Sequence, residues 1–258
     1  LPEGPSVQEA TGNKAPVRTY QDLLRNPYDE QRFEHYSSAE IARVTLDGHL
    51  TVILPTALWR SIDLSPDGEY LLAQKITRPY SYIVPVSRFA SDFNIYNREG
   101  TLINEFYHKP LIEQLPTGFD AVATGKRAID WRSDKPATLY WAEAADGGDP
   151  SVKTEIRDRL YMVSAPFIDE PRLFAETSLR YASIIWGNSN GAILNTDWWK
   201  TRKEQTHWLT DLDGKTKSDL WFDRNSEDLY KDPGDFVTVP NQYGRWVLAF
   251  SRSGKALY

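Results

Sequence analysis

The sequence predicts an all-β protein made of repeated four-stranded antiparallel sheets, and three observations carry this prediction. Aromatic residues make up 13% of the 258 residues, and aromatic side chains favour pleated, half-buried strands. From about residue 40 onward, short apolar runs alternate with Gly, Pro and Asp, which is the pattern of strands joined by tight turns. In addition, one strand–turn–strand unit recurs along the chain.

The N-terminal segment, residues 1–38, is predicted to be rich in loops. Pro, Gly and polar residues dominate its first fifteen positions. Residues 20–24 and 29–36 are expected to form short helical turns, separated by Pro27, which interrupts helices. The first residue is Leu1 rather than an initiator Met and no signal peptide is evident, so we expect a processed or excised piece of a longer protein.

Three dipeptides predict hairpins between apolar runs. Asp47-Gly48 separates residues 41–46 from 50–54, and Asp67-Gly68 separates residues 61–64 from 70–73. Glu99-Gly100 plays the same part between residues 93–96 and 101–106. Glycine accepts the positive φ that tight hairpin turns require, so each pair has a physical reason to be a turn.

The repeated unit decides the architecture. Leu72, Leu139, Ile193 and Val247 hold equivalent positions in it and are 67, 54 and 54 residues apart. A repeat of about 50 residues made of short strands is typical of a β-propeller, in which each blade is a four-stranded antiparallel sheet. Two more strands follow each of the first three units. The predicted blades are residues 59–106, 126–175 and 180–223.

The two ends of the repeat array are incomplete. Residues 40–54 supply only an outer half-blade, and residues 236–258 supply only an inner half-blade. Each blade is apolar on both faces and needs a neighbour on each side. The half-blades therefore either combine to close a ring of about four blades, or the chain is part of a larger ring.

Composition excludes several classes of function. The net charge is −6, whereas a nucleic-acid-binding domain carries a basic face; the short basic run at Lys200 is predicted to be a turn. There is no Cys and no apolar run of the roughly 18 residues that a membrane-spanning helix needs. We therefore expect no nucleic-acid partner, no membrane span, no metal and no cofactor.

A series of short segments lies in a specific order along nearly the whole chain. They are residues 17–24, 78–85, 134–141, 146–149, 200–202, 222–224 and 232–234. Each segment alone is weak evidence, but in this order they resemble the glutamyl endopeptidases, serine peptidases of the prolyl oligopeptidase family.

The resemblance implies a role. Members of the family have an N-terminal β-propeller followed by an α/β-hydrolase domain, which carries a Ser-His-Asp triad and cleaves peptides after Glu. This chain resembles only the propeller, so we expect no catalytic residue in it and no activity from it alone. Its expected partners are the hydrolase domain of the same protein and peptide substrates, which it would gate and position. The resemblance leaves the compartment open; bacterial relatives are often exported, which favours the periplasm or secretion.

Arg78, Tyr80, Tyr82 and Arg88 are the candidate substrate-facing residues. They lie in a long aromatic loop, and loops carry function more often than strands do. Cleavage after Glu needs a cation to meet the substrate carboxylate, which Arg can bind in bidentate fashion. The alternative is that these arginines form structural ion pairs. Members of the family usually have Gly directly before the Arg that corresponds to Arg88, whereas this chain has Ser87 there. We therefore expect the local hairpin to differ.

Other motifs are predicted to be structural. The segment 187–191 fits G-x-S-x-G, but an apolar strand pattern follows Ser189 where a nucleophile elbow would have a helix; we predict a hairpin turn. Asp211–Gly214 is predicted to be a turn and Asp146–Asp149 a polar loop between strands, rather than cation sites. Trp198, Trp199, Trp208 and Trp221 are expected to fill space between blades rather than stack on a sugar. A stand-alone binding module for a glycan or protein partner is the alternative function.

Overall fold

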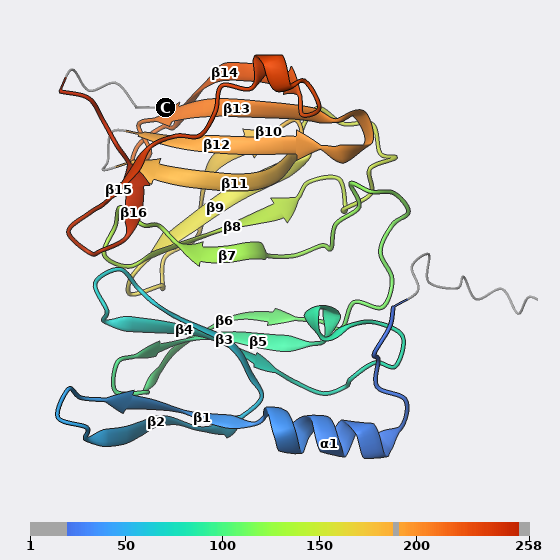
Figure 1. Cartoon of the computed structure of the whole chain (residues 1–258), viewed down its shortest axis with the longest axis vertical. Coiled ribbons are helices and arrows are strands. Elements are labelled where there is room, and N and C mark those ends of the chain that lie inside the picture. The colour runs from blue at the N-terminus through green and yellow to red at the C-terminus, as the bar shows by residue number, and fades with distance from the viewer. Residues whose placement is uncertain (1–19, 188–190, 253–258) are drawn as a thin grey trace, which may run out of the picture.

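The computed structural model describes residues 20–187 and 191–252. These residues form three four-stranded sheets and two two-stranded sheets, all with antiparallel neighbours (Figure 1). The first four-stranded sheet contains β3 (Trp59–Leu64), β4 (Tyr70–Ile76), β5 (Ser91–Asn97) and β6 (Leu102–Lys109). The second contains β7 (Arg127–Trp131), β8 (Thr138–Ala144), β9 (Asp158–Ser164) and β10 (Arg172–Thr177). The third contains β11 (Arg180–Gly187), β12 (Gly191–Trp198), β13 (Lys203–Thr210) and β14 (Lys217–Asn225).

The strand order within each of these sheets follows the order in the chain, which is the topology of a propeller blade. The prediction of an all-β fold built from propeller blades is confirmed. The two-stranded sheets are β1 (Ala39–Val44) with β2 (Leu50–Ala57), and β15 (Thr238–Pro240) with β16 (Trp246–Leu248). In the described residues these half-blades form two separate sheets and do not pair with each other.

Helix α1 (Pro27–Ser37) corrects the prediction for the N-terminal segment. Pro27 does not interrupt a helix but begins one, because a proline in the first turn loses no helical hydrogen bond. The side chain of Asn26 caps the helix by accepting a hydrogen bond of 3.0 Å from the Asp29 N–H. Residues 20–24 form a bend instead of the expected helical turn, with Asp22 at a φ of +57°. The remaining helical segments are single 3₁₀ turns: η1 (Val86–Arg88), η2 (Trp199–Thr201) and η3 (Leu229–Lys231).

Apolar side chains fill the space between successive sheets. Leu72 and Ile95 of the first sheet pack with Trp131, Leu139 and Trp141 of the second. A second cluster joins the second and third sheets. The repeat positions Leu72, Leu139, Ile193 and Val247 are all buried, as expected if each blade presents the equivalent residue to a neighbour. The turn of the last half-blade also reaches the first sheet, since the Arg245 guanidinium lies 3.2 Å from the Asp63 carboxylate.

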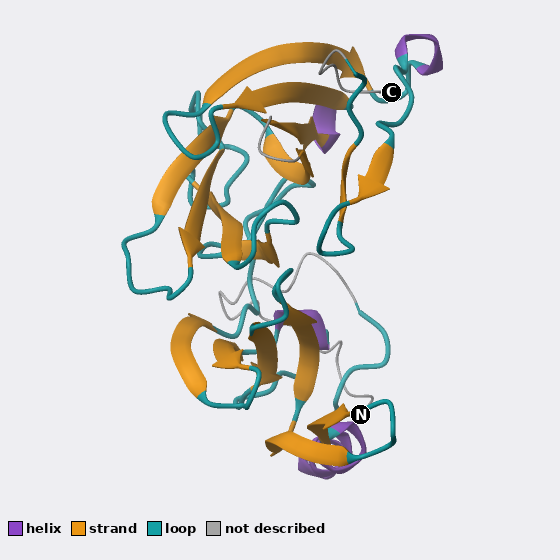
Figure 2. Ribbon diagram, turned by 90° about the vertical axis from the view of Figure 1, so that its left-hand side faces the viewer, coloured by secondary structure: helices purple, strands orange, loops and turns teal. Residues whose placement is uncertain are grey.

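The up-and-down order of the strands sorts the connections onto two faces. The tight hairpin turns, such as the one at Gly68, lie on one face. The longer connections lie on the other, together with α1, on the right in Figure 1. We call this the loop face; it comprises α1 and residues 77–90, 110–126, 145–157 and 199–202. Figure 2 shows the sheets from the side, with helical ribbon confined to short segments. No helix in the described residues is long and apolar enough to cross a membrane.

The division into residues 1–38 and 39–258 remains a prediction, because the first nineteen residues lie outside the part of the chain that the structure describes.

Candidate functional site

The four candidate residues lie on the loop face, in the connection between β4 and β5. This connection is anchored to α1 through aromatic rings. The Phe33 ring of α1 meets the Tyr80 ring edge-on at 5.4 Å and the Phe89 ring at 6.1 Å. Tyr80 and Phe89 also stack on each other at 5.5 Å. Phe89 is buried, so the loop has a core of its own.

Two glutamates of α1 bind three of the candidates: Arg78 contacts both, and Tyr80 and Tyr82 contact one each. The Arg78 guanidinium lies 2.6 Å from Glu30 Oε2 and 2.8 Å from Glu34 Oε1. The Tyr80 hydroxyl donates a hydrogen bond of 2.6 Å to Glu34, and the Tyr82 hydroxyl donates one of 2.7 Å to Glu30. The structure therefore brings these three residues together around two carboxylates.

These contacts shift the titration of the cluster. Hydrogen bonds from Tyr82 and then Arg78 hold the pKa of Glu30 below its usual range. Hydrogen bonds from Arg78 and then Tyr80 lower the pKa of Glu34 in the same way. Both carboxylates are therefore ionised at neutral pH. They already pair with the Arg78 guanidinium, so any further anion at Arg78 would share it with two carboxylates.

Arg88 lies apart from the other three. It ends η1, and its guanidinium lies 5.4 Å from the centroid of the Tyr20 ring. It lines a cavity together with residues of the connection between β6 and β7. The substrate-facing role of the four residues remains a prediction, and the structure divides them into a group paired with α1 and a single cation at a cavity.

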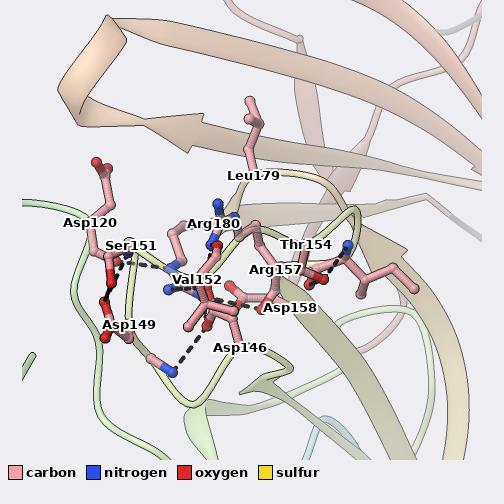
Figure 3. Close-up of polar contacts among 12 residues, drawn as sticks. Asp120, Asp146, Asp149, Ser151, Val152, Thr154, Arg157, Asp158, Leu179 and Arg180 are labelled. Atoms are coloured by element: carbon pink, nitrogen blue, oxygen red, sulfur yellow. Dashed lines mark hydrogen bonds and ion pairs between the residues drawn. The ribbon is translucent and has the colours of Figure 1, made fainter.

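A buried charge network, which the sequence did not reveal, lies beside these loops (Figure 3). Arg180 is 3% exposed. Its guanidinium binds both carboxylate oxygens of Asp146 at 2.9 and 2.8 Å, and Asp158 Oδ1 at 3.0 Å. Its Nε donates a hydrogen bond of 2.9 Å to the backbone carbonyl of Asp120. Arg157 adds a contact of 2.8 Å to Asp146. Buried charges need such partners, because each loses its hydration.

The network connects three loops of the loop face. Burial raises the pKa of Asp146, but the hydrogen bonds from Arg180 and Arg157 outweigh it and keep the pKa below its usual range. The carboxylate of Asp120 accepts hydrogen bonds from the backbone N–H groups of Trp199 at 2.6 Å and Lys200 at 3.1 Å. The one sequence signal was the run Asp146–Asp149. It lies in the connection between β8 and β9, as predicted, and the cations at Asp146 are the guanidinium groups of Arg180 and Arg157.

The G-x-S-x-G segment lies between two paired strands. Gly187 pairs with Gly191 in the register of β11 and β12, and a strand follows the motif as predicted. Ser189 itself lies outside the described residues. His207 is in β13, opposite Leu194 and Leu220, where it contacts Ser218 at 3.3 Å.

The tryptophans only partly follow the prediction that they fill space between blades. Trp198 lies over buried cations, with the Arg157 guanidinium 4.6 Å from its ring centroid. Trp208 stacks on Trp221 at 5.1 Å. However, Trp221 is 40% exposed and Trp199 is 54% exposed. The interpretation is wrong for Trp199, which sits in the η2 turn. Trp221 is only partly covered, since its ring lies 6.4 Å from that of Phe236, in the segment before β15.

The comparisons with known proteins identify the chain's relatives. No family model matches the sequence. A protein named "Probable glutamyl endopeptidase, chloroplastic" from Oryza sativa subsp. japonica is 41% identical over 253 residues, which cover 96% of this chain. The chain is homologous to one segment of the glutamyl endopeptidases. The protein of the same name from Arabidopsis thaliana is 36% identical over 252 residues. The chain spans 27% and 26% of the lengths of these two glutamyl endopeptidases.

Among solved structures, this chain is similar to an oligogalacturonate lyase in complex with manganese, with a TM-score of 0.43 and 10% sequence identity. The match covers 72% of this chain and 48% of the lyase.

Proposed function

We propose that this chain is a non-catalytic β-propeller segment of a glutamyl endopeptidase-like serine peptidase, which gates and positions peptides for a hydrolase domain elsewhere in the same protein. The observation that carries the proposal is the extent of the similarity. It covers 96% of this chain but only about a quarter of each relative, so the relatives have ample further sequence for a catalytic domain.

The packing between the sheets suits a steric gate. Asn104 of β6 donates a hydrogen bond of 3.0 Å across to the backbone carbonyl of Phe167, in the turn between β9 and β10 of the second sheet. The buried Phe167 ring meets Tyr70 of the first sheet at 5.1 Å. Blades joined in this way form a stiff wall, because close-packed interiors deform little. Such a wall excludes folded proteins without any dedicated residue, while an extended peptide can pass its edge.

A substrate series on the full-length protein tests the gate. One small Glu-containing domain is offered in its folded form and as a destabilised variant that is unfolded, together with a short Glu peptide. We expect kcat/KM to be high for the peptide and the unfolded variant and to fall to background for the folded domain. Asn104→Ala, which loosens the contact between sheets, should raise cleavage of the folded domain.

Asn195→Ala is the matched control, because Asn195 bonds within its own sheet, to Ser183 at 3.2 Å. Equal cleavage of the folded and unfolded forms would contradict the gate. An identical folded-to-unfolded ratio in the wild type and Asn104→Ala would show that these sheets do not provide the exclusion.

One observation favours the second candidate, a binding module for a glycan or protein partner. Trp221 is 40% exposed and its ring is stacked on Trp208, and exposed aromatic rings often form ligand-binding faces. Binding of an oligosaccharide library monitored by Trp fluorescence, with Trp221→Ala as the comparison, tests it. A ligand lost on that substitution supports the module, and no binding in the library rejects the glycan form.

A further inference from the structure

The sulfur of Met162, the one methionine of this chain, lies between two charged hydrogen-bond donors. It accepts a hydrogen bond of 3.3 Å from the Arg132 guanidinium and one of 3.1 Å from the Arg172 guanidinium. Met162 is 5% exposed and Arg132 is 1% exposed. A thioether sulfur is a weak acceptor, whereas charged donors form their strongest hydrogen bonds with oxygen acceptors. An oxygen atom at this position would therefore bind the two donors better than the sulfur does.

Both guanidinium groups are held in place by further contacts. The carboxylate oxygens of Asp134 accept hydrogen bonds of 3.0 and 2.7 Å from Arg132. Arg172 donates to the backbone carbonyl of Gly214 at 3.0 Å and to that of Leu212. The donors are thus fixed beside the sulfur by groups other than the sulfur itself.

Carboxylates balance the charge of these cations. Asp213 lies 3.4 Å from the Arg132 guanidinium and 2.6 Å from Lys135 Nζ. Burial raises the pKa of Asp213, but the hydrogen bond from Lys135 and the charge of Arg132 outweigh it and lower the pKa. Asp213 is therefore an anion at neutral pH, as a partner for Arg132 in addition to Asp134. This balance matters because sulfur gains partial positive charge when it is oxidised, and uncompensated cations would oppose that charge.

A cavity of about 290 Å³ gives access to the sulfur. Met162, Arg132 and Arg172 all line it, and it lies among the β7–β8, β9–β10 and β13–β14 connections. Its lining includes the exposed residues Asp169 and Glu170, so the cavity opens to solvent. A single water needs only about 10–15 Å³ of such space, and hydrogen peroxide is only one oxygen atom larger than water. The cavity therefore admits peroxide to a side chain that is otherwise buried.

We propose that hydrogen peroxide oxidises Met162 to methionine sulfoxide in the folded protein, and that Arg132 and Arg172 bind the new oxygen. The sulfur lone pair attacks one peroxide oxygen, and the O–O bond breaks. The departing hydroxide takes the proton of the transferred oxygen and leaves as water, so sulfur loses two electrons and the peroxide gains them. An Arg172 N–H can donate to the departing oxygen while the O–O bond breaks.

The product differs from an ordinary oxidised methionine in a core, which disrupts packing because it becomes polar. Here the sulfoxide oxygen replaces a weak acceptor with a strong one, opposite two charged donors. Arg132 and Arg172 also contact the β13–β14 turn, at Asp213 and Gly214. Oxidation would therefore strengthen the contact between the second and third sheets. The proposal is independent of the gate proposed above.

The stereochemistry of the sulfoxide tests the site. Sulfur has two lone pairs, and oxidation of each gives a different epimer, so fixed donors and a fixed cavity favour one of them. The full-length protein is treated with hydrogen peroxide in native buffer and, separately, in concentrated urea. After digestion, the peptide that contains Met162 is treated with two sulfoxide reductases, each of which reduces one epimer, and is weighed by mass spectrometry.

We expect one epimer to exceed the other by about tenfold or more in native buffer, because a hydrogen bond from a charged donor is worth that much. In urea the donors are no longer beside the sulfur, and we expect the two epimers in equal amounts. Oxidation in native buffer should proceed at urea concentrations too low to unfold the protein.

Arg172→Leu removes the half-buried donor and should reduce both the epimer ratio and the rate of oxidation in native buffer by about tenfold. Arg172→Lys keeps a charged donor and should restore part of both. Arg159→Leu is the matched control. Arg159 lies in the same strand as Met162 but pairs with Glu176 at 2.9 Å, outside the cavity, so this variant should match the wild type. Circular dichroism checks the folding of each variant.

Equal amounts of the two epimers from the folded protein would overturn the proposal. So would oxidation that appears only as urea unfolds the protein, since Met162 would then react as an ordinary buried methionine. A folded Arg172→Leu variant with the rate and the epimer ratio of the wild type would also overturn it. If Arg172→Leu does not fold, the comparison of the wild type in native buffer and in urea decides alone.

Discussion

Replacing Arg180 with Met is the sharpest test of the buried charge network. The substitution removes five hydrogen bonds: two to Asp146, one to Asp158, and one each to the backbone carbonyls of Asp120 and Arg157. Removing one partner of a buried ion pair costs about 3–5 kcal/mol, because the remaining charge stays buried. Asp146 keeps Arg157 and Asp158 keeps Arg127, so we expect the lower end, about 3 kcal/mol.

Urea unfolding of the protein followed by Trp fluorescence measures this loss. Trp198 is a local reporter, because the Arg180 guanidinium lies 5.9 Å from its ring centroid. Arg159→Met is the matched control: Arg159 is an arginine of the neighbouring second sheet that pairs with Glu176 at 2.9 Å, and both side chains are exposed. An exposed pair contributes about 0–1 kcal/mol, so the control should change little.

The pH dependence gives a second measurement of the same network. The folded-state pKa of Asp146 is lowered, so its contribution to stability is present above the unfolded-state pKa of about 3.9. That contribution disappears as the pH falls through the folded-state value. The difference between wild type and Arg180→Met should therefore shrink in acid. A loss no larger than that of Arg159→Met, or a difference independent of pH, would refute the reasoning.

Three further predictions concern single positions. Gly147 and Gly148 both have positive φ, but only at Gly148 would a Cβ meet the backbone carbonyl of Val122, at 2.0 Å. Gly147→Ala should cost about 1–2 kcal/mol in urea unfolding and Gly148→Ala about 1–3 kcal/mol more; equal costs would contradict the close approach. Burial lowers the folded-state pKa of His207, opposed by Asp223, so its contribution to stability is present above the unfolded-state value of about 6.5 and is lost as the pH falls. The stability of wild type should fall more steeply between pH 7 and 5 than that of His207→Gln, and parallel curves would refute this. Tyr82→Phe should raise the pKa of Glu30 in an NMR titration, because the largest cause of its lowering is removed; an unchanged pKa would contradict the hydrogen bond.

The sheets were predictable because strands and the tight turns between them depend on residues that are close together in the sequence. Gly48, Gly68 and Gly100 all have positive φ, as the hairpin prediction requires. The spacing of Leu72, Leu139 and Ile193 located the core position of each blade. Helix α1 was only partly predicted, because a proline such as Pro27 can either begin a helix or interrupt one. The side-chain cap at Asn26 shows that the helix begins here.

The polar sites were harder to predict because their members come from distant parts of the chain. Arg180 binds Asp146 and the Asp120 carbonyl, 34 and 60 residues away. Arg88 and Lys126 line the same cavity although they lie on either side of β5 and β6 in the chain. No local pattern records such pairings. The four candidate residues do share one loop, but Arg88 lies apart from the other three, and the partners of Arg78 lie on α1, 48 and 44 residues earlier.

The two hydrogen bonds that the Asp120 carboxylate accepts have a mechanical consequence. The chain leaves the first blade at Lys109 and does not enter the second until Arg127. On the way, Asp120 is tied to the backbone of Trp199 and Lys200, which belong to the turn of the third blade. Tension on the first blade is therefore transmitted to the third as well as to the second. The connection between blades one and two is therefore held to blade three by the same carboxylate, so the three blades are joined by more than the contacts between neighbouring sheets.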